Sequence, residues 1–491
     1  MEKAAAAKIK LKTRELWGYA SGEGATSITM NGIGNFSMLF YTQILGISPE
    51  LVGIALSIAT VWDAVTDPLM GTISDRTYSR FGRRHPYMFI GGILLTLSFL
   101  AVWFVPESFE GEKVIFVYLL IVNIFVKTAF TLFIVPYTAL GFEMCKTDND
   151  RARLQGVRYA FNMVVNILTG GLAWVLFFPD QQAANGAVID GTKIHQNYLN
   201  MGGVLAASSL LLTLFCIFAT YKYAERGLKK NEAEGMAEHV KAFMHDLKDV
   251  YSDKLVWFVF GFFGIAQFSM MVVSQVQMFT YVEYMRFTAA EKTFVHTGGM
   301  VGFMLGSLLL GTMVRRLDKK LTGYIAMVAS SFGCLALLVI FTGGLMDPQA
   351  QIGSFPVAVA VFGLMQMLWW GGCGIIVPLA ASMIADLSMV KRIKTGEITE
   401  GRYAAGFSFF LKAASAIGLL ITGYVLKGVG YVSDAEFQTP ETIDKLALMT
   451  FIIGPIVMLI SYLVLRKYPI THEFLNRLRR QHGLEEEPQT L

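Results

Sequence analysis

The division of this chain into long apolar blocks is the feature that most constrains its fold. About twelve such blocks follow one another along the 491 residues. A helix needs about 20 mainly apolar residues to cross the hydrocarbon core of a bilayer. Only 16% of the residues are charged, against roughly 25% in soluble chains. We therefore predict an all-α, polytopic membrane protein surrounded by lipid. The net charge of +4 is too small to indicate a nucleic-acid partner.

The Lys and Arg residues are distributed unevenly between the two sets of connecting loops. The predicted spans lie near residues 22–46, 51–74, 87–105, 114–142, 156–178, 200–223, 255–284, 294–314, 322–343, 354–385, 403–428 and 446–466. Of the 41 Lys and Arg residues, 33 lie in the tails and alternate loops, six in the other loops and two inside spans. Because cytoplasmic loops are enriched in Lys and Arg, both termini are predicted to be cytoplasmic.

A hydrophilic stretch at residues 225–254 divides the chain into two six-helix halves, residues 1–224 and 255–491. We expect this linker to contain a short amphipathic helix around residues 236–250. The segments Gly71–Arg84 and Gly311–Lys320 resemble each other, since each places a glycine, an acid and a basic cluster after the second span of a half. Paired halves of this kind suit a carrier that rocks two bundles around a central site. The residues to which we assign a gating role in these loops are Asp75, Arg83, Arg84 and Arg315.

Two acidic residues inside the second span are the strongest candidates for chemistry. Asp63 and Asp67 are four residues apart and therefore share one helix face, with Thr66 beside them. Two carboxylates held close inside a bilayer cannot both remain charged without compensation, so one must bind a proton, a cation or a basic side chain. The site therefore suits H⁺ or Na⁺. A purely structural ion pair with a neighbouring helix is the alternative.

Two lysines inside spans are candidate partners of these acids. Lys127 lies one turn from Thr131 in the fourth span, and Pro136 interrupts the same span. Lys127 is a buried partner in one interpretation and extends outward to the membrane surface in the other. Lys412 lies in an otherwise apolar span, so we predict that it faces the pore.

Polar and aromatic residues within spans are candidates for binding a solute, since sugar sites combine aromatic planes with polar side chains. Glu23 either faces the cavity or marks a helix start, and Asp386 forms a gate ion pair or binds a ligand. The proposed substrate-binding residues are Glu23, Arg158, Tyr137, Asn162, Gln267, Trp370 and Lys412. Weaker candidates are Tyr19, Tyr41, Tyr159, Gln275, Gln277, Gln366 and Trp369.

The sequence gives no indication of an enzyme or of a bound cofactor. All seven histidines fall in predicted loops, tails or span ends, without metal-ligand spacing. A glycine-rich phosphate loop followed by Lys and Ser or Thr is also missing from the sequence. Energy for transport is therefore expected from an ion gradient rather than from ATP bound by this chain.

Four segments together resemble one transporter family over nearly the whole chain. These are Trp62–Gly71, Ser74–Tyr87, Val135–Leu140 and Met383–Gly418. They are similar to the glycoside–pentoside–hexuronide:cation symporters, the melibiose permease-like family of the major facilitator superfamily. The resemblance implies twelve helices, an inner-membrane location and a functional monomer. It also implies that Asp63, Asp67 and Thr131 bind the coupling cation, that Arg158 lines the sugar cavity and that Lys412 is the family's helix-eleven lysine.

The chain departs from the family pattern at several of these positions. Ile134 stands where the pattern has a sugar-binding aspartate, and Thr138 stands where it has a tryptophan. Glu23 is the nearest counterpart of a span-one acid. Lys127 replaces a small residue close to the cation site, so its ammonium group can neutralise a carboxylate in place of Na⁺. This substitution predicts proton coupling or weakened sodium dependence.

The sequence therefore predicts a secondary active symporter that moves a small molecule, a sugar or glycoside, together with H⁺ or Na⁺. One alternative is transport of a lysolipid or another non-sugar solute, as in a distant branch of the family. A lateral apolar cavity would favour that alternative over a closed polar pocket. A membrane receptor without transport is the third alternative, and it would be favoured if the two acids were sealed in an ion pair with no cavity.

Overall fold

The computed structural model describes residues 11–482 apart from residues 146, 183–185, 187, 225–235, 398, 434 and 436. The first half contains the helices α1 (Thr13–Leu39), α2 (Pro49–Asp75), α3 (His85–Trp103), α4 (Glu112–Met144), α5 (Asp148–Asn166), α6 (Ala173–Phe177) and α7 (His195–Thr220). They are followed by α8 (Met236–Ser252), α9 (Val256–Phe279), α10 (Ala289–Leu337), α11 (Val357–Thr395), α12 (Glu400–Gly428), α13 (Pro440–Arg466) and α14 (His472–Gln481). Two short strands, β1 (Gln181–Gln182) and β2 (Val188–Ile189), form an antiparallel hairpin.

The described helices account for the predicted spans. Within this part of the chain, nine helices are long and apolar enough to cross a membrane. One of them, α10, joins two predicted spans across a kink at Asp318, whose φ of 67° lies in the left-handed region. The more polar helix α1 and the α5–α6 segment overlap the two remaining spans. The all-helical, polytopic class is therefore confirmed, and the two-residue strands are a small unpredicted addition.

Several helices extend further than hydropathy predicts. Helix α1 begins at Thr13 rather than near residue 22, and α5 begins at Asp148 rather than near residue 156. The added turn of α1 contains Glu15, which is only 7% exposed and accepts hydrogen bonds from Lys222 and Tyr223. Hydropathy identifies only the part of a helix that crosses the hydrocarbon core, whereas these polar turns are stabilised by hydrogen bonds to other parts of the protein.

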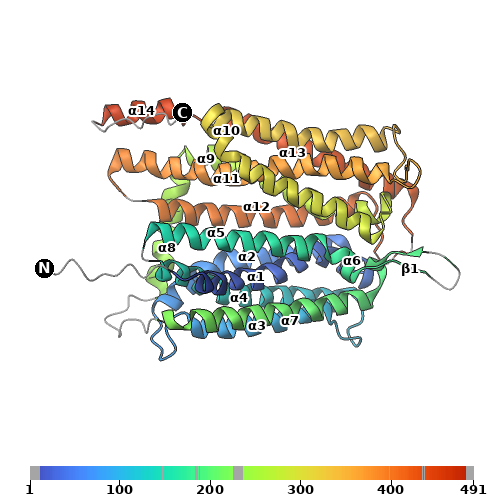
Figure 1. Ribbon diagram of the computed structural model, residues 1–491, viewed down its shortest axis with the longest axis horizontal. Coiled ribbons are helices and arrows are strands. Elements are labelled where there is room, and N and C mark those ends of the chain that lie inside the picture. Colours follow the sequence, from blue (N-terminus) through green and yellow to red (C-terminus); the bar gives the residue numbers. More distant parts are fainter. Residues whose placement is uncertain are drawn as a thin grey trace.

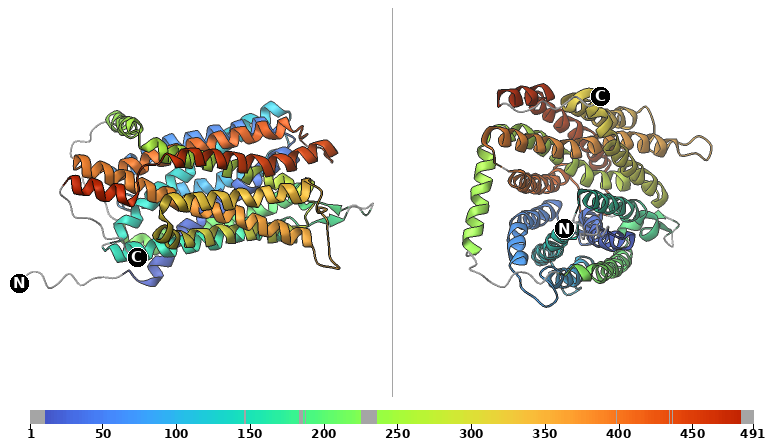
Figure 2. Two further views of the ribbon diagram at one scale, coloured as in Figure 1. Left: turned by 90° about the horizontal axis from the view of Figure 1, so that it is seen from above. Right: turned by 60° about the vertical axis from the view of Figure 1, so that its left-hand side comes forward.

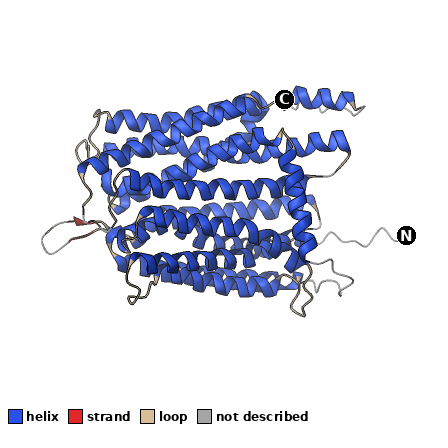
Figure 3. Ribbon diagram, turned by 180° about the vertical axis from the view of Figure 1, so that it is seen from behind, coloured by secondary structure: helices blue, strands red, loops and turns tan. Residues whose placement is uncertain are grey.

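The long helices run side by side in two groups (Figure 1). Helices α1–α7 lie together below α9–α13 in this view, and α12 packs against α2 between the groups. Helix α8 crosses the ends of the long helices (Figure 3), and the second view of Figure 2 shows it running from one group towards the other. We call this end, which also carries α14, the α8 end. The opposite end, which carries β1 and β2, is the hairpin end. Helix α8 agrees with the predicted amphipathic helix, whereas linker residues 225–235 lie outside the described residues.

The first connection of each half repeats the same local structure. Helix α1 ends in a π-helical turn at Phe40–Ile44, and α9 ends in one at Thr280–Tyr284. Each turn is followed by a residue with positive φ, 66° at Gly46 and 49° at Arg286. The next long helix then begins three residues later in both cases, at Pro49 and at Ala289. The two halves are therefore structural repeats at this point, although their sequences differ there.

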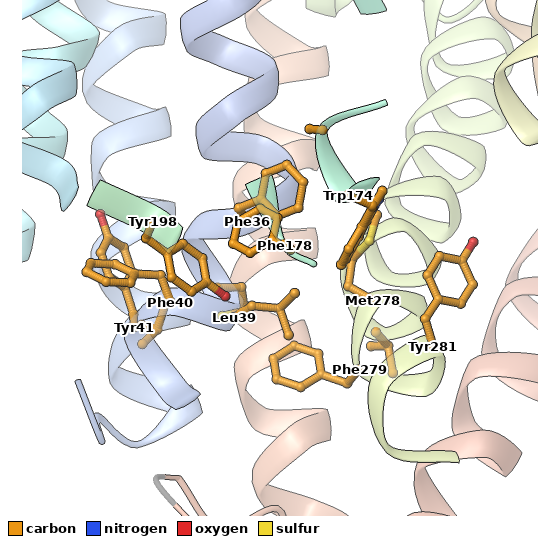
Figure 4. Packing of buried hydrophobic residues seen from close by; sticks show 14 of the residues in the cluster. Phe36, Leu39, Phe40, Tyr41, Trp174, Phe178, Tyr198, Met278, Phe279 and Tyr281 are labelled. Carbon is orange, nitrogen blue, oxygen red and sulfur yellow. The ribbon is translucent and has the colours of Figure 1, made fainter. Parts of the chain in front are cut away.

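A cluster of large aromatic side chains fills the hairpin end (Figure 4). Trp174 of the first half contacts Tyr281 of the second half, with ring centroids 6.4 Å apart. Phe36 packs between Trp174 and Phe178, at 4.9 Å from each ring. All four side chains are at most 1% exposed. Burial of aromatic surface therefore joins the two halves at this end.

Candidate functional site

The two acids of α2 lie together and share one hydroxyl group. Thr131 of α4 donates a hydrogen bond to Asp67 Oδ1 at 2.8 Å and lies 3.2 Å from Asp63 Oδ1. The Thr66 hydroxyl lies 3.4 Å from that of Thr131. Asp63 is only 3% exposed. The predicted cation-site residues therefore converge from two helices, because residues four apart on α2 present both carboxylates to the same face of α4.

Two ammonium groups compensate these carboxylates. Lys412 Nζ, on α12 of the second half, lies 2.9 Å from Asp63 Oδ2 and 2.5 Å from Asp67 Oδ2. Lys127 Nζ lies 3.8 Å from Asp63 Oδ2. The cluster thus contains two formal negative and two formal positive charges. Lys127 contributes to this ion cluster rather than extending to the membrane surface, and Lys412 joins it across the boundary between the halves.

A cavity of about 240 Å³ lies between the two halves. Polar side chains line it from both halves: Asn31 and Asn35 on α1, Asn166 on α5, Ser274 and Gln277 on α9, His296 on α10 and Trp370 on α11. Met163, Met300 and Met304 are among its apolar lining residues. A cavity of mixed apolar surface and a few convergent polar groups is the usual form of a small-molecule site.

A continuous chain of hydrogen bonds links this cavity to a buried ion pair. Arg158 Nε donates to Glu23 Oε2 at 2.6 Å, and Asn162 Nδ2 donates to Glu23 Oε1 at 3.3 Å. Asn166 Nδ2 donates to Asn162 Oδ1 at 2.9 Å, and Asn31 donates to Asn166. On each helix these residues recur at multiples of four, so they lie on facing stripes of α1 and α5. We call this chain of five residues the polar ladder.

The predicted substrate-binding residues separate into three groups. Trp370 lines the cavity, and Lys412 belongs to the ion cluster. Glu23, Arg158 and Asn162 form the charged end of the polar ladder; Glu23 lies ten residues inside α1 and so does not mark a helix start.

The remaining two predicted substrate residues lie away from the cavity. Tyr137 is fully buried, stacks on Tyr19 at 4.3 Å and donates to its backbone carbonyl. The Tyr137 ring also packs beside Arg158, whose guanidinium carbon lies 5.4 Å from the ring centre. Gln267 donates to Ser415 within the second half. Neither side chain is among the cavity lining.

The predicted gating residues form ion pairs within each half. Arg84 bonds Asp75 and lies 2.9 Å from Glu143, which also accepts from Arg83 at 2.7 Å. In the second half, Lys319 Nζ lies 2.7 Å from Asp386 Oδ2, and the Tyr468 hydroxyl donates to the same oxygen at 3.2 Å.

Asp386 therefore adopts the ion-pair alternative. Arg315 is exposed, and none of the ion pairs seen between described residues includes it. These contacts fasten loops to their own half rather than one half to the other.

Several residues that line the cavity are absent from the predicted substrate-binding set. His296 was assigned to a span end, but it lies two turns inside α10 and is only 8% exposed. Asn31, Asn35 and Asn166 were not singled out, although their spacing from Glu23 and Arg158 by multiples of four was a readable signal. In contrast, the contact of α10 with the turn after α5 depends on the packing of the two halves and has no local signature.

No group of three or more His, Cys, Asp or Glu side chains among the described residues is arranged to hold a metal ion. The two carboxylates and the hydroxyls of Thr66 and Thr131 offer oxygen ligands of the kind that small alkali cations use. Such an ion would be transported cargo rather than a resident cofactor.

Comparison with known proteins gives the family. The family model described as "MFS/sugar transport protein" matches residues 18–472. The inner membrane symporter YicJ of Escherichia coli is 26% identical over 93% of this chain and 92% of its own length. The sodium-dependent lysophosphatidylcholine symporter 1 of Xenopus tropicalis is 24% identical over 93% of this chain and 87% of its own.

The fold is similar to that of a solved bacterial homologue of the human lysosomal transporter Spinster. The TM-score is 0.64 at 12% identity, and the match covers 93% of this chain and 98% of that one. The relatives and structural neighbours are transporters rather than enzymes. The chain is thus a multi-pass membrane transporter, and it belongs to the family of MFS/sugar transport proteins.

Proposed function

We propose that this protein is a secondary active symporter that couples movement of a sugar to movement of H⁺ by alternating access. One observation carries this proposal: Lys412 of the second half bonds both carboxylates of the first half, at 2.9 and 2.5 Å. Rocking one half against the other separates Lys412 from Asp63 and Asp67. Whether Lys412 neutralises the two carboxylates therefore depends on the relative position of the halves.

The charges of the cluster give the expected coupling ratio. When Lys412 moves away, Asp63, Asp67 and Lys127 remain in the first half with a formal charge of −1. An uncompensated charge in a low-dielectric environment is strongly unfavourable. One monovalent cation restores neutrality, so we expect one cation to move with each sugar.

Lys127 favours H⁺ over Na⁺ as that cation. Sodium binds through several oxygen ligands at once, and an ammonium group 3.8 Å from Asp63 repels a second cation at the same carboxylate. A proton needs one carboxylate oxygen and no coordination shell. Asp67 is the expected proton carrier, because Lys127 lies beside Asp63.

Uptake into proteoliposomes tests this proposal. Labelled monosaccharides and disaccharides are offered under an imposed H⁺ or Na⁺ gradient. We expect the H⁺ gradient to drive accumulation and Asp67→Asn to abolish it. In Lys127→Ala, we expect an imposed Na⁺ gradient to raise sugar uptake at least about threefold over uptake without a gradient, because the variant lacks the ammonium group that repels Na⁺. Lys445→Ala, which removes a lysine paired with Glu441 on the exposed side of α13, is the matched control and should leave the ion dependence unchanged.

Two results would contradict the proposal. Sodium-driven accumulation by the unmodified protein would refute proton coupling. Absence of any gradient-driven uptake in correctly folded protein would refute symport and favour a receptor-like role, although the cavity between the halves argues against that role.

Transport of a lysolipid is the second candidate, and it is favoured by the similarity to the lysophosphatidylcholine symporter. An apolar groove of about 300 Å³ lies between α3 and α4 and is lined by residues such as Leu94, Leu97 and Phe125. This groove is confined to the first half, whereas alternating access acts on a site between the halves. The amide-lined cavity therefore favours the sugar. Labelled lysophosphatidylcholine in the same vesicles distinguishes the two candidates.

The Lys and Arg bias supports a cytoplasmic position for the α8 end, and the inner membrane location of YicJ supports the same membrane for this protein. Accessibility of a single cysteine introduced in the linker, measured with an impermeant reagent on intact cells and on inverted vesicles, tests that orientation.

A further inference from the structure

The cavity between the halves contains unpaired polar groups that call for a ligand. Gln277 is only 1% exposed, and its Oε1 has no hydrogen-bond partner among the described residues. Among the described residues, Asn35, Ser274 and His296 likewise make no side-chain hydrogen bond within the protein. A buried amide oxygen without a partner is unfavourable, because it has lost its hydrogen bonds to water and gained none in exchange. These groups are therefore arranged to receive hydrogen bonds from a bound molecule.

The wall of the cavity requires a glycine at Gly170, where side chains of α1 and α10 approach the turn after α5. A Cβ atom on Gly170 would lie 3.2 Å from both Asn35 Nδ2 and His296 Nε2, and 2.1 Å from Met300. Gly170 belongs to the π-helical turn at Ile167–Gly171, which follows α5 directly. This turn contacts α1 on one side and α10 on the other, so one cavity is lined by polar groups from both halves.

Formal charges lie outside the cavity lining. The lining contains amides, a hydroxyl, an imidazole, an indole and methionines, and none of its residues is Asp, Glu, Lys or Arg. The charged pair Glu23 and Arg158 bond each other at 2.6 Å, and Asn162 and Asn166 separate that pair from the cavity along the polar ladder. A charged ligand would lose its hydration without gaining an opposite charge, which is strongly unfavourable.

We infer that this cavity binds a neutral, polyhydroxylated ligand of monosaccharide size, an inference that rests on the proposed sugar symport and narrows its substrate class. Asn35, Asn166, Gln277 and His296 supply donors and acceptors for hydroxyl groups, and Trp370 supplies an aromatic plane for the sugar ring. The volume of about 240 Å³ is below the roughly 300–1,000 Å³ of pockets for drug-sized ligands. The uncharged lining therefore disfavours uronates, and the small volume favours a monosaccharide over disaccharides and lysolipids.

Equilibrium binding to the purified full-length protein, measured without any ion gradient, tests this assignment. The probes are D-glucose, D-galactose, D-xylose, D-glucuronate, maltose and lysophosphatidylcholine. We expect at least one neutral monosaccharide to bind at least tenfold more tightly than glucuronate, maltose and the lysolipid. Tighter binding of any of those three, or no binding of a neutral monosaccharide by folded protein, would overturn the inference.

Substitutions identify the cavity as the place of binding. Gln277→Leu and Asn166→Leu are expected to weaken binding of the monosaccharide at least tenfold. Asn123→Leu is the matched control, because Asn123 is equally buried but bonds Tyr41 within the first half and does not line the cavity. Unchanged affinity in both cavity variants would refute the assignment.

A variant that gains affinity for a new ligand must be folded, so it shows that weaker binding in the leucine variants does not result from misfolding. Asn166→Asp keeps the side-chain size and adds a negative charge to the lining. We expect it to raise the affinity for cationic D-glucosamine relative to D-glucose at least tenfold, and an unchanged ratio would count against the site. Binding of a neutral sugar without gradient-driven uptake would contradict symport alone, whereas gradient-driven uptake of glucuronate would contradict the ligand class alone.

Discussion

At the scale of single residues, the ion cluster is held by charges that balance only together. Removing Lys412 alone leaves the buried Asp63 and the half-buried Asp67 against one ammonium group. Breaking a fully buried pair destabilises by about 3–5 kcal/mol, and the partial exposure of Asp67 reduces that loss here. We predict that Lys412→Ala lowers the thermal stability of the detergent-solubilised protein, and that the double variant Lys412→Ala/Asp67→Asn recovers most of that loss while remaining inactive in uptake. Melting followed by fluorescence-detected size exclusion measures the first effect. A double variant less stable than Lys412→Ala would contradict this balance of charges.

At the scale of elements, the connections after α1 and after α9 each contain one residue with positive φ. Glycine adopts this conformation without strain at the first connection, whereas arginine is strained at the second. Gly46 has φ of 66°, and Arg286 has φ of 49° in the equivalent place. The left-handed region costs a side chain with a Cβ roughly 1–2 kcal/mol, and glycine avoids that cost. Arg286→Gly is therefore expected to stabilise the protein by about 1 kcal/mol, and Gly46→Ala to destabilise it by a similar amount. Melting temperatures of the two variants should move in opposite directions; a parallel shift would show that the two connections are not equivalent.

At the scale of the whole molecule, three ion pairs join the halves at the hairpin end, in addition to the ion cluster of Lys412 with Asp63 and Asp67. Lys292 of α10 is fully buried against Asp190, Lys193 Nζ lies 3.2 Å from Glu283, and Lys427 Nζ lies 2.6 Å from Glu50. These contacts hold the halves together at the hairpin end. The ion pairs at the α8 end that were described above lie within single halves.

Weakening these contacts should change the population of states in which the hairpin end is open. We predict that Lys292→Met/Asp190→Asn lengthens the distance between spin labels at Lys113 and Leu345, both of which are exposed. The four native cysteines are buried, which limits background labelling. Lys445→Met/Glu441→Gln removes an exposed pair within α13 and is the matched control. An unchanged distance distribution would contradict this prediction and show that the two remaining ion pairs and the aromatic cluster hold this end closed without the Lys292–Asp190 pair.

The sequence by itself determined the features that depend on neighbours along the chain. Bilayer-length apolar blocks predicted the helices, and the four-residue spacing of Asp63 and Asp67 predicted a shared face. The intramembrane position of Lys412 indicated a functional charge before its partner was known. The ends of α1 and α5 were predicted too short, because polar turns stabilised inside the protein do not resemble lipid-facing sequence.

Tertiary structure alone decided which residues meet across the halves. Lys412 reaches Asp67 from 345 positions away along the chain, and His296 reaches the cavity because Gly170 leaves room for α10 against the turn after α5. Tyr137 resembled a sugar-binding aromatic residue but packs against Tyr19 instead. Periodicity fixes which face of a helix a side chain occupies, whereas the partner of that face depends on long-range packing. Local spacing therefore indicated the shared face of Asp63 and Asp67 and the stripes of the polar ladder, whereas closure of the cavity by side chains of α9, α10 and α11 depends on how the two halves pack.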